Sequence, residues 1–481
     1  MDWQEAILAW LVVPLVVIIV GELLLRYFRG RWRVSRLADL IEAHFHPIPA
    51  DNLTISERQF PHRVRVDLQR AIDRLFKGDA TICHFCGVRT EYAHEEIGFS
   101  LMLNSYRQSV PAQYEEIDIG EEQPIRCLKI GVWLLQEGNV KYAVFFAPAY
   151  HCGVPNGIRF EVAAVNSPDG TRITQQFFKQ LEESVLKAES YRGKILSLEM
   201  KQSYYGVSSG ITVHKLRTVE RDQVILPRKT LELLERNIIT FVRQRPRLRE
   251  LKQATKKGLL FYGNPGTGKT HTIHYIAKSL EGHTTLLIAA EQVALLEEYM
   301  VLARLLQPTI VVIEDVDLIA RDRTQMGSPY EEVLLNKLLN EMDGLKEDAD
   351  ILIILTTNRP EALEAALASR PGRIDQAIEF PLPDAEGREK LIRLYSQGIE
   401  LSPEIIQTIV KRTEKVSAAF IKELMRRSTQ FHLERADSLG IELEDVENAL
   451  GEMLFAGGSL NLKLLGGNGA TSTQVNSGSG S

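Results

Sequence analysis

Residues 257–277, KGLLFYGNPGTGKTHTIHYIA, decide the fold of the C-terminal half of this chain. The apolar run before residue 263 predicts a buried strand, and the residues from 269 onward predict a helix. Between them, GNPGTGKT (263–270) matches the pattern G-x-x-x-x-G-K-[ST]. Glycines in such a loop let backbone N–H groups fold around phosphates, and the helix N-terminus adds its positive end. We therefore predict a nucleotide-binding loop rather than a glycine-rich turn with a surface lysine.

The loop pattern also assigns chemistry to individual side chains. Lys269 is expected to meet the β- and γ-phosphates, and the Thr270 hydroxyl to ligate Mg²⁺. The predicted nucleotide-binding residues are Gly263, Asn264, Pro265, Gly266, Thr267, Gly268, Lys269, Thr270 and His271.

The sequence around the loop has the rhythm of a doubly wound parallel sheet. Strand-like TTLLIAA (284–290), TIVVIED (309–315) and DILIILTTN (350–358) alternate with helical segments. From about 386 to 455 the pattern is helical throughout, which predicts a small lid. The expected boundaries are 219–385 for the α/β subdomain, 386–456 for the lid, and 457–481 for a disordered Gly/Ser-rich tail.

Residues from about 225 to 450 resemble the ATPase module of the AAA family. After the loop come IVVIEDVDLIARDR, NKLLNEMDGL, LTTNRPEALEAALASRPGRID and EFPLPDAEGR, each where the family has its counterpart. The resemblance implies an α/β fold, a P-loop AAA ATPase with a parallel-sheet core and a helical lid. It also implies ATP and Mg²⁺ as cofactors and a homo-oligomeric ring, in this family usually a hexamer.

Catalytic roles follow from the same resemblance. Asn358 matches the sensor that orients the attacking water. Arg370 and Arg373, in SRPGR, look like arginine fingers, which reach a neighbouring subunit's γ-phosphate and neutralise the charge that develops there. The alternative is that these arginines make structural salt bridges.

The two acids that end the strand at 309–313 stand in reversed order. By alignment, Glu314 occupies the place of an Asp that holds the Mg²⁺ water shell, and Asp315 that of a Glu that polarises the attacking water. The swap keeps both charges but lengthens one side chain and shortens the other. Since a general base displaced by about 1 Å costs up to about 10²-fold in rate, we expect active but slow hydrolysis unless the loop has shifted to compensate.

The segment at 287–308 lacks the aromatic-apolar-Gly tripeptide with which AAA unfoldases thread peptides. Tyr299 is its only aromatic residue, and helical spacing with neighbouring leucines predicts that it belongs to the core. This departure favours coupling through another domain. The missing loop, the reversed acids, a middle domain and an N-terminal membrane helix together resemble the layout of the mitochondrial inner-membrane AAA translocase that handles folded Rieske protein.

The N-terminal residues predict a membrane anchor. Residues 6–25 form an almost wholly apolar run, long enough to cross a hydrocarbon core of about 30 Å as a helix. Arginines follow it at 26, 29, 31, 33 and 36, so the positive-inside rule keeps the C-terminal side in the cytoplasm, or in the matrix of a mitochondrion. We expect a single-pass anchor at 1–30 that contacts the bilayer, in a bacterial plasma membrane or a mitochondrial inner membrane. A buried or oligomer-forming helix is the alternative.

Residues 31–218 predict an α+β middle domain. Residues from about 35 to 75 look helical, and IRCLKIGVWLLQ, VKYAVFFAPAY and IRFEVAAVN look like strands separated by the turn signals EGN and VPNG. The helical TQQFFKQLEESVLKAE and the strand-like GKILSLEM and GITVHKL complete the domain. The pattern contains no catalytic constellation.

Other candidate sites are weaker. The CHFC pair at Cys83 and Cys86 has metal spacing, but one C-x-x-C is poor evidence, and buried thiols are favoured over zinc. HEEIG (94–98) lacks the second histidine of the protease motif H-E-x-x-H, so a zinc protease is rejected. A formal charge of −6 argues against nucleic acid as a partner, and the basic run 243–257 is interpreted as a solvated linker helix.

These patterns predict a membrane-anchored, ring-forming AAA ATPase that couples Mg-ATP hydrolysis to remodelling or translocation of a protein substrate, without pore-loop threading. The alternative is a nucleotide-gated membrane scaffold, in which ATP binding drives assembly and hydrolysis only resets it.

Overall fold

The fold was obtained as a computed structural model. It describes residues 36–78, 80–90, 97–103, 107–151, 154–203, 206–319, 337–361, 373–435 and 440–453. Within these ranges, no helix combines the length and the apolar character needed to cross a bilayer. The predicted anchor at 6–25 and the predicted tail at 457–481 lie outside the described residues.

The chain divides into two compact units. One contains residues up to 188 together with 201–210, and the other contains 189–200 and the residues from 211 onward. The first unit contains α2 (Leu37–Phe45), β1 (Leu53–Phe60), α3 (Arg65–Leu75), β2 (Thr81–Val88), α4 (Phe99–Leu103), β3 (Ser109–Val110), β4 (Tyr114–Ile117), β5 (Ile125–Leu128), β6 (Gly131–Glu137), β7 (Val140–His151), β8 (Val154–Val165) and α5 (Pro168–Lys187).

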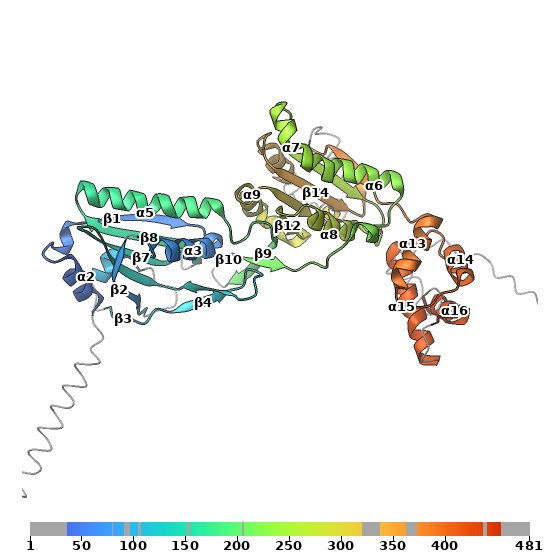
Figure 1. The fold of residues 1–481 in the computed structure, drawn as a ribbon, viewed down its shortest axis with the longest axis horizontal. Helices are drawn as coiled ribbons and strands as arrows, with labels where there is room; N and C mark the ends of the chain where they lie inside the picture. The colour runs from blue at the N-terminus through green and yellow to red at the C-terminus, as the bar shows by residue number, and fades with distance from the viewer. Residues whose placement is uncertain are drawn as a thin grey trace, which may run out of the picture. The chain divides into compact units, whose positions relative to one another are not determined.

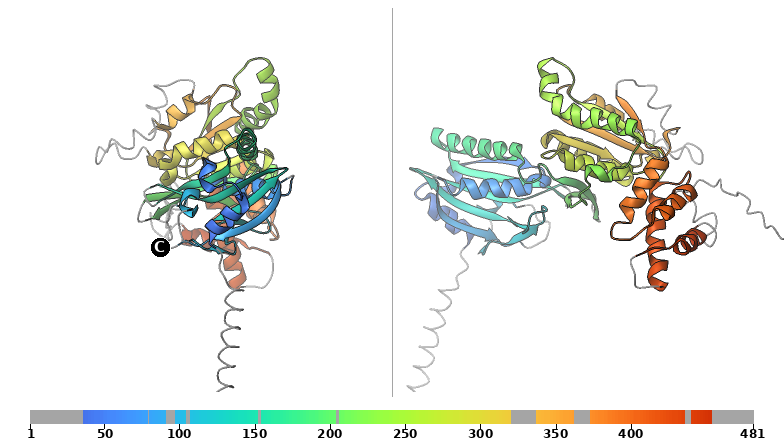
Figure 2. Two further views of the ribbon diagram at one scale, coloured as in Figure 1. Left: turned by 90° about the vertical axis from the view of Figure 1, so that its left-hand side faces the viewer. Right: turned by 45° about the vertical axis from the view of Figure 1, so that its right-hand side comes forward.

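A six-stranded sheet in the order β1-β8-β7-β6-β2-β3 forms the centre of the first unit. Alternate strand residues face opposite sides, so Val132 and Leu134 of β6 pack with α2 and α4, while Trp133 packs 4.9 Å from the ring of Phe76 beyond α3. Helices α3 and α5 pack together over this second face (Figures 1 and 2). The turn EGN joins β6 to β7 as predicted, with Gly138 at φ 58°.

Two expectations about this unit were wrong. Residues 53–60 were included in a helical stretch, but they form β1, which pairs antiparallel with β8 from Leu53↔Val165 to Phe60↔Ile158. The polar residues of LTISERQF give no clear strand pattern in the sequence. The segment is a strand because it pairs with β8, and the local sequence does not predict that pairing. The domain boundary expected at residue 219 also differs. Two strands that precede residue 219, at 195–203 and 206–214, belong to the seven-stranded sheet of the second unit.

The second unit is a seven-stranded sheet with helices and a helical lid. Its sheet elements are β9 (Ile195–Ser203), β10 (Gly206–His214), α6 (Arg228–Glu235), a π-helical turn η4 (Arg236–Thr240), α7 (Phe241–Glu250), β11 (Lys257–Tyr262), α8 (Lys269–Ser279), β12 (Thr284–Ile288), a 3₁₀-helix η5 (Ala290–Leu295), α9 (Leu296–Leu305), β13 (Thr309–Ile313), α10 (Val316–Ile319), β14 (Ile351–Thr357) and β15 (Gln376–Glu379). The lid contains α13 (Ala385–Tyr395), α14 (Pro403–Arg412), α15 (Ala418–Arg435) and α16 (Leu443–Gly451).

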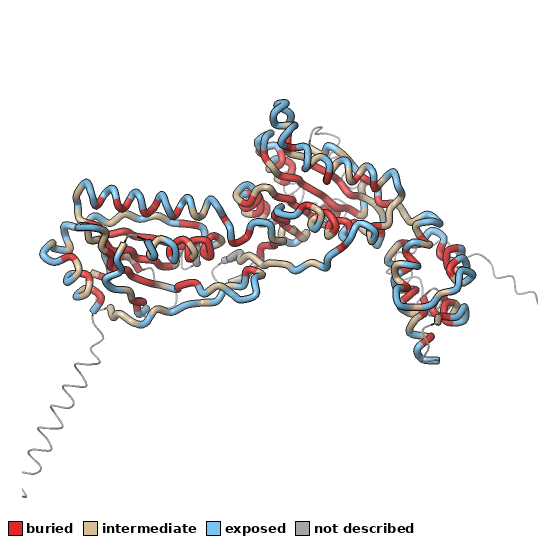
Figure 3. The backbone as a smooth tube through the Cα atoms, viewed as in Figure 1, coloured by how far each residue is buried: buried red, intermediate tan, exposed pale blue. Residues whose placement is uncertain are grey.

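The strand order β10-β9-β12-β13-β14-β11-β15 explains where the functional residues meet. Strands β12, β13, β14, β11 and β15 are parallel, which confirms the predicted parallel-sheet core. All residues of β13 and β14 are buried, as expected for central parallel strands (Figure 3). The carboxyl ends of β11, β13 and β14 therefore lie side by side, and the loops that follow them share one edge of the sheet.

Candidate active site

The phosphate loop at 263–270 connects β11 to α8 in a conformation that requires glycine. Gly263, Gly266 and Gly268 have φ values of 146°, 76° and 98°. A Cβ on Gly263 would lie 2.3 Å from the carbonyl oxygen of Phe380, so the close approach also excludes a side chain there. The loop therefore presents main-chain N–H groups and the start of α8 to one cavity, which is suited to an anion.

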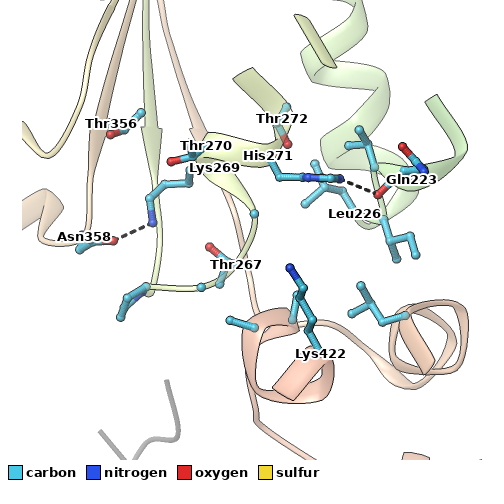
Figure 4. A pocket seen from close by; sticks show the side chains of 18 of the residues that line it. Gln223, Leu226, Thr267, Lys269, Thr270, His271, Thr272, Thr356, Asn358 and Lys422 are labelled. Atoms are coloured by element: carbon cyan, nitrogen blue, oxygen red, sulfur yellow. Dashed lines mark hydrogen bonds between the residues drawn. The ribbon is translucent and has the colours of Figure 1, made fainter. Parts of the chain in front are cut away.

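Lys269 stands at the centre of the loop. Its Nζ donates to the carbonyl oxygens of Gly263 at 2.8 Å and Asn264 at 3.1 Å, and to Oδ1 of Asn358 at 2.8 Å (Figure 4). Burial lowers the pKa of Lys269, whereas the carboxylate of Asp315 acts in the opposite direction. A desolvated ammonium that has only oxygen partners is a strong ligand for phosphate oxygens.

Thr270 and Glu314 form the candidate metal site. The hydroxyl of Thr270 donates to Oε1 of Glu314 at 2.9 Å. The backbone N–H of Glu314 donates to the carbonyl of Ile288 at 2.9 Å, which holds the residue at the end of its strand. A hydroxyl oxygen beside a carboxylate oxygen, next to a phosphate loop, fits the oxygen ligands that Mg²⁺ takes together with water and substrate phosphates.

Asp315 and Asn358 lie beside Lys269 and are joined to it by a chain of hydrogen bonds. Asp315 has φ 48°, and its backbone N–H donates to Oγ1 of Thr356 at 3.0 Å. Nδ2 of Asn358 donates to Oδ1 of Asp315 at 3.0 Å, while Oδ1 of Asn358 accepts from Lys269. One amide therefore orients both the ammonium and the carboxylate. The arrangement suits a base and a sensor that act on one water molecule.

Sequence reasoning missed Asp317, the third acid of EDVD. Its side chain is 1% exposed, and Oδ1 accepts from the hydroxyl of Thr357 at 2.9 Å and from the backbone N–H of Asn358 at 3.1 Å. Asp317 therefore ties the residues after β13 to the end of β14, and holds Asn358 in place. The available signal was the third acid at the end of IVVIEDVD (310–317).

The cavity beside the loop has a volume of about 390 Å³. The lid closes one side of it, because the N–H of Ala419 donates to the carbonyl of Gly266 at 3.1 Å. His271 hydrogen-bonds through Nε2 to the carbonyl of Gln223 at 3.1 Å, and burial lowers the pKa of His271. Lining residues that sequence reasoning did not single out are Gln223, Val224, Ile225, Leu226, Thr272, Thr356, Leu391, Tyr395 and Lys422.

The two predicted arginine fingers have different positions. Arg370 lies outside the described residues. Arg373 is 11% exposed, and its Nε donates to Oδ1 of Asp343 in the same chain at 2.9 Å, with Nη2 bound to the other carboxylate oxygen. Arg373 therefore makes the structural salt bridge that was the alternative to a role as an arginine finger. That Arg373 reaches into a neighbouring subunit stays a prediction.

Tyr299 is a core residue, as predicted. It is fully buried, and its hydroxyl accepts from the N–H of Leu198 at 2.7 Å and lies 3.1 Å from both the carbonyl of Leu287 and Oε1 of Gln292. Nε2 of Gln292 donates to the carbonyl of Leu198 at 2.6 Å. Two side chains of the segment 287–308 therefore extend the sheet bonding of β9.

The two cysteines on β2 differ in burial. Cys86 is buried, as expected, but Cys83 is exposed, so the expectation of buried thiols was wrong for Cys83. Across the described part of the chain, no group of three or more His, Cys, Asp or Glu residues is placed to hold a metal ion. Cys152 lies outside the described part of the chain.

Comparison with known proteins agrees with this geometry. Residues 259–382 match the model of the ATPase family associated with various cellular activities (AAA). The chain is 33% identical over 206 residues to a proteasome-activating nucleotidase of Methanosphaerula palustris, 32% over 236 residues to the ATP-dependent zinc metalloprotease FtsH 3 of Symbiobacterium thermophilum, and 33% over 221 residues to the 26S proteasome regulatory subunit 8 homolog of Schizosaccharomyces pombe.

These alignments cover 40%, 46% and 43% of this chain, and 50%, 37% and 54% of the respective relatives. The chain thus spans about a third to two thirds of the length of the curated relatives it matches. The matched part is an AAA ATPase domain. Such a domain hydrolyses ATP, with Mg²⁺ as the metal cofactor.

Proposed function

We propose, from the premise that residues 259–382 belong to an AAA ATPase domain, that this chain is a membrane-anchored ring ATPase that remodels or translocates a protein substrate. The observation that carries the proposal is the bond chain Asp315–Asn358–Lys269 beside the Thr270–Glu314 pair. It supports the proposal because the candidate base Asp315, the candidate sensor Asn358 and Lys269 are joined by hydrogen bonds, close to the candidate metal-binding pair.

In this mechanism the loop amides and Lys269 bind the phosphates of ATP. Thr270 and Glu314 would hold Mg²⁺, and the bound metal would supply positive charge that neutralises phosphate charge. Asp315 takes the proton of the attacking water, and Asn358 keeps that carboxylate and the Lys269 ammonium in register. Arg370 supplies positive charge from the adjoining subunit, and Asn358 would transmit the state of the phosphates to β14.

The membrane anchor and the ring are supported by sequence. The apolar run 6–25 is followed by five arginines within eleven residues, and this supports an anchored protein whose ATPase domain faces the cytoplasm or the matrix. Relatives that are named for the proteasome and the SRPGR motif support a homo-oligomeric ring, with a hexamer as the expected form. The resemblance in predicted layout to the Rieske-protein translocase supports a protein as the substrate.

Coupling without threading is supported by Tyr299. Its hydroxyl bonds to main-chain groups of β9 and β12, so this aromatic ring is not available to grip a substrate in the pore of a ring. We therefore propose that the middle domain, to which β9 and β10 connect, passes the motion of the ATPase domain to the substrate.

Phosphate release by the full chain, purified in detergent with Mg-ATP, tests the enzyme. We expect Lys269→Ala to abolish turnover and Lys278→Ala, an exposed lysine at the other end of α8, to leave it unchanged. Mixing inactive Lys269→Ala subunits with inactive Arg370→Ala subunits tests the ring, because activity returns only if fingers act across an interface. A wild-type chain without turnover would refute the proposal that the protein is an ATPase. A mixture without activity would refute the proposal that Arg370 acts on the site of a neighbouring subunit.

A cellular assay separates the remodelling ATPase from the nucleotide-gated scaffold. If the protein is a scaffold, Asp315→Asn, which is trapped in the ATP state, restores its cellular function. If the protein is a remodelling ATPase, neither Asp315→Asn nor Lys269→Ala restores that function.

A further inference from the structure

The helix that precedes β11 exposes a row of positive charges. α6, η4 and α7 follow one another without a break in the helical backbone, from residue 228 to residue 250. One side of this helix packs on the core of the second unit through Leu231, Leu234, Ile238, Ile239 and Val242. The other side carries exposed residues along its whole length (Figure 3), which is about 35 Å at about 1.5 Å per residue.

The charge of this helix is opposite in sign to that of the whole chain. Residues 228–250 contain seven lysines and arginines but three glutamates, whereas the formal charge of the chain is −6. Because positive charge is gathered on one helix of an acidic protein, this helix attracts an anionic surface that the rest of the chain repels.

The acidic residues of the helix do not neutralise the row. Each of them is already bound by an arginine: Glu232 by Arg228 at 2.8 Å, Glu235 by Arg221, and Glu250 by Arg247 at 2.6 Å. Lys229, Arg236 and Arg243 are exposed, and within the described residues they have no ion pair. These three cations are therefore left to a partner outside the chain.

The carboxyl end of the helix adds an apolar group and favours one kind of partner. Leu251 is 57% exposed and is followed by the exposed Lys252. Phe241, the aromatic residue of the helix, has its ring covered by Arg245 and by Lys257, whose Nζ lies 4.4 Å from the ring centroid. Proteins that bind single-stranded nucleic acids stack the bases on available aromatic rings, whereas basic side chains beside an exposed leucine suit a membrane surface.

We propose that the exposed side of residues 228–252 binds an anionic membrane surface. Lys229, Arg236 and Arg243 contact lipid phosphates, and Leu251 enters the boundary between the head groups and the acyl chains. A straight helix with cations along its outer side fits a flat surface that carries many phosphates. The contact is independent of the nucleotide site, and it differs from the predicted anchor at 6–25 because it depends on the charge of the lipid.

The full chain reconstituted in lipid vesicles tests the contact. Gln244, an exposed residue beside Arg243, is replaced by cysteine, and its alkylation by iodoacetamide at pH 8 is followed by mass spectrometry of its peptide. In vesicles that contain phosphatidylglycerol we expect alkylation at least about fivefold slower than in phosphatidylcholine alone, since each basic residue near an anionic surface strengthens binding about fivefold. The difference should disappear at high salt, which screens the charges.

Two variants of the labelled chain test the role of the charges. The first removes the row, with Lys229→Gln, Arg236→Gln and Arg243→Gln, and should abolish the difference between the two kinds of vesicle. The matched control removes the same charge from α13 and α14, with Lys390→Gln, Arg393→Gln and Lys411→Gln, and should keep the full difference. All six residues are exposed, so both variants should melt at the wild-type temperature.

Three outcomes overturn the inference. Equal alkylation of Gln244→Cys in both kinds of vesicle would show that lipid charge does not draw the helix to the membrane. Protection that survives the loss of the row would show that these cations do not make the contact. Protection by added single-stranded DNA, with none from phosphatidylglycerol, would assign the surface to nucleic acid. A chain that does not insert into vesicles would refute the predicted anchor alone, because the same comparison can be made with vesicles added to the chain in solution.

Discussion

The reversed acids can be tested by restoring the usual order with the double variant Glu314→Asp, Asp315→Glu. Asp315 adopts φ 48°, in the left-handed region, where most residues other than glycine pay about 1–2 kcal/mol. Aspartate tolerates this conformation better than most residues, because its short polar side chain bonds locally. The backbone N–H of Asp315 is bonded to Thr356 and its carboxylate to Asn358. The order Glu-Asp therefore suits the backbone.

The variant is expected to lose rather than gain activity. A glutamate at 315 gives up the local advantage of aspartate, at a cost of about 1 kcal/mol, and moves the carboxylate by about one methylene. A displacement of about 1 Å at the reacting group costs up to about 10²-fold, so we expect kcat to fall ten- to a hundredfold. The shorter residue at 314 also loses its 2.9 Å bond from Thr270, which should raise the Mg²⁺ requirement.

Steady-state phosphate release, measured against ATP and against Mg²⁺, gives kcat and both half-saturation concentrations. Asp315→Asn is the control, since asparagine accepts the same backbone conformation but removes the base. It should bind ATP with nearly wild-type affinity and hydrolyse it at least about 10²-fold more slowly. A double variant that hydrolyses ATP as fast as wild type, or faster, would refute the link between the backbone at 315 and the order of the acids.

Further variants test the surroundings of the site. Gly266→Ala should weaken ATP binding at least about tenfold, because φ 76° and a contact of 2.8 Å with the lid leave no room for a methyl group; calorimetry that gives wild-type affinity would contradict this. Glu314→Gln should raise the Mg²⁺ concentration for half-maximal turnover about tenfold with little change in ATP binding, and an unchanged Mg²⁺ titration would remove Glu314 from the metal site. Tyr299→Phe should lower the free energy of unfolding by about 1–3 kcal/mol in urea titrations, since a buried main-chain N–H loses its partner; a loss below about 0.5 kcal/mol would show that the bond carries no weight. Iodoacetamide at pH 8 should alkylate Cys83 but not Cys86, because Cys86 is buried and burial raises its pKa to about 11; equal rates, followed by mass spectrometry, would show that β2 opens in solution.

The motif at 263–270 predicted Lys269 and Thr270 as nucleotide-site residues, whereas Glu314 and Asn358 were predicted from the resemblance to the AAA family. The structure brings these four residues to one edge of the parallel sheet, because β11, β13 and β14 end side by side. Their catalytic roles stay predictions. The reversed acids were visible in the sequence, but the φ of Asp315 that accommodates them was not.

What the sequence did not reveal depends on partners far along the chain. β1 is recognisable as a strand only through β8, more than 100 residues later, because its polar residues alternate with few large apolar ones. The bond from Arg373 to Asp343 and the approach of Lys422 to the loop likewise join segments that no local pattern connects. Propensity and spacing predict elements, and tertiary contacts choose between their possible neighbours.

The segment 287–308 connects the acids to the strand that leads out of the ATPase domain. The N–H of Glu314 is bonded to the carbonyl of Ile288 at the end of β12, and Gln292 and Tyr299 then bond both main-chain groups of Leu198 on β9. If Glu314 shifts during hydrolysis, either its bond to Ile288 breaks or the end of β12 moves with it. If the end of β12 moves, we expect Gln292 and Tyr299, which bond to β9, to move as well. In a threading ATPase this segment would carry a side chain to the substrate. Here Gln292 and Tyr299 bond to a strand instead, and this supports our proposal that hydrolysis acts on the substrate by way of β9 and the middle domain.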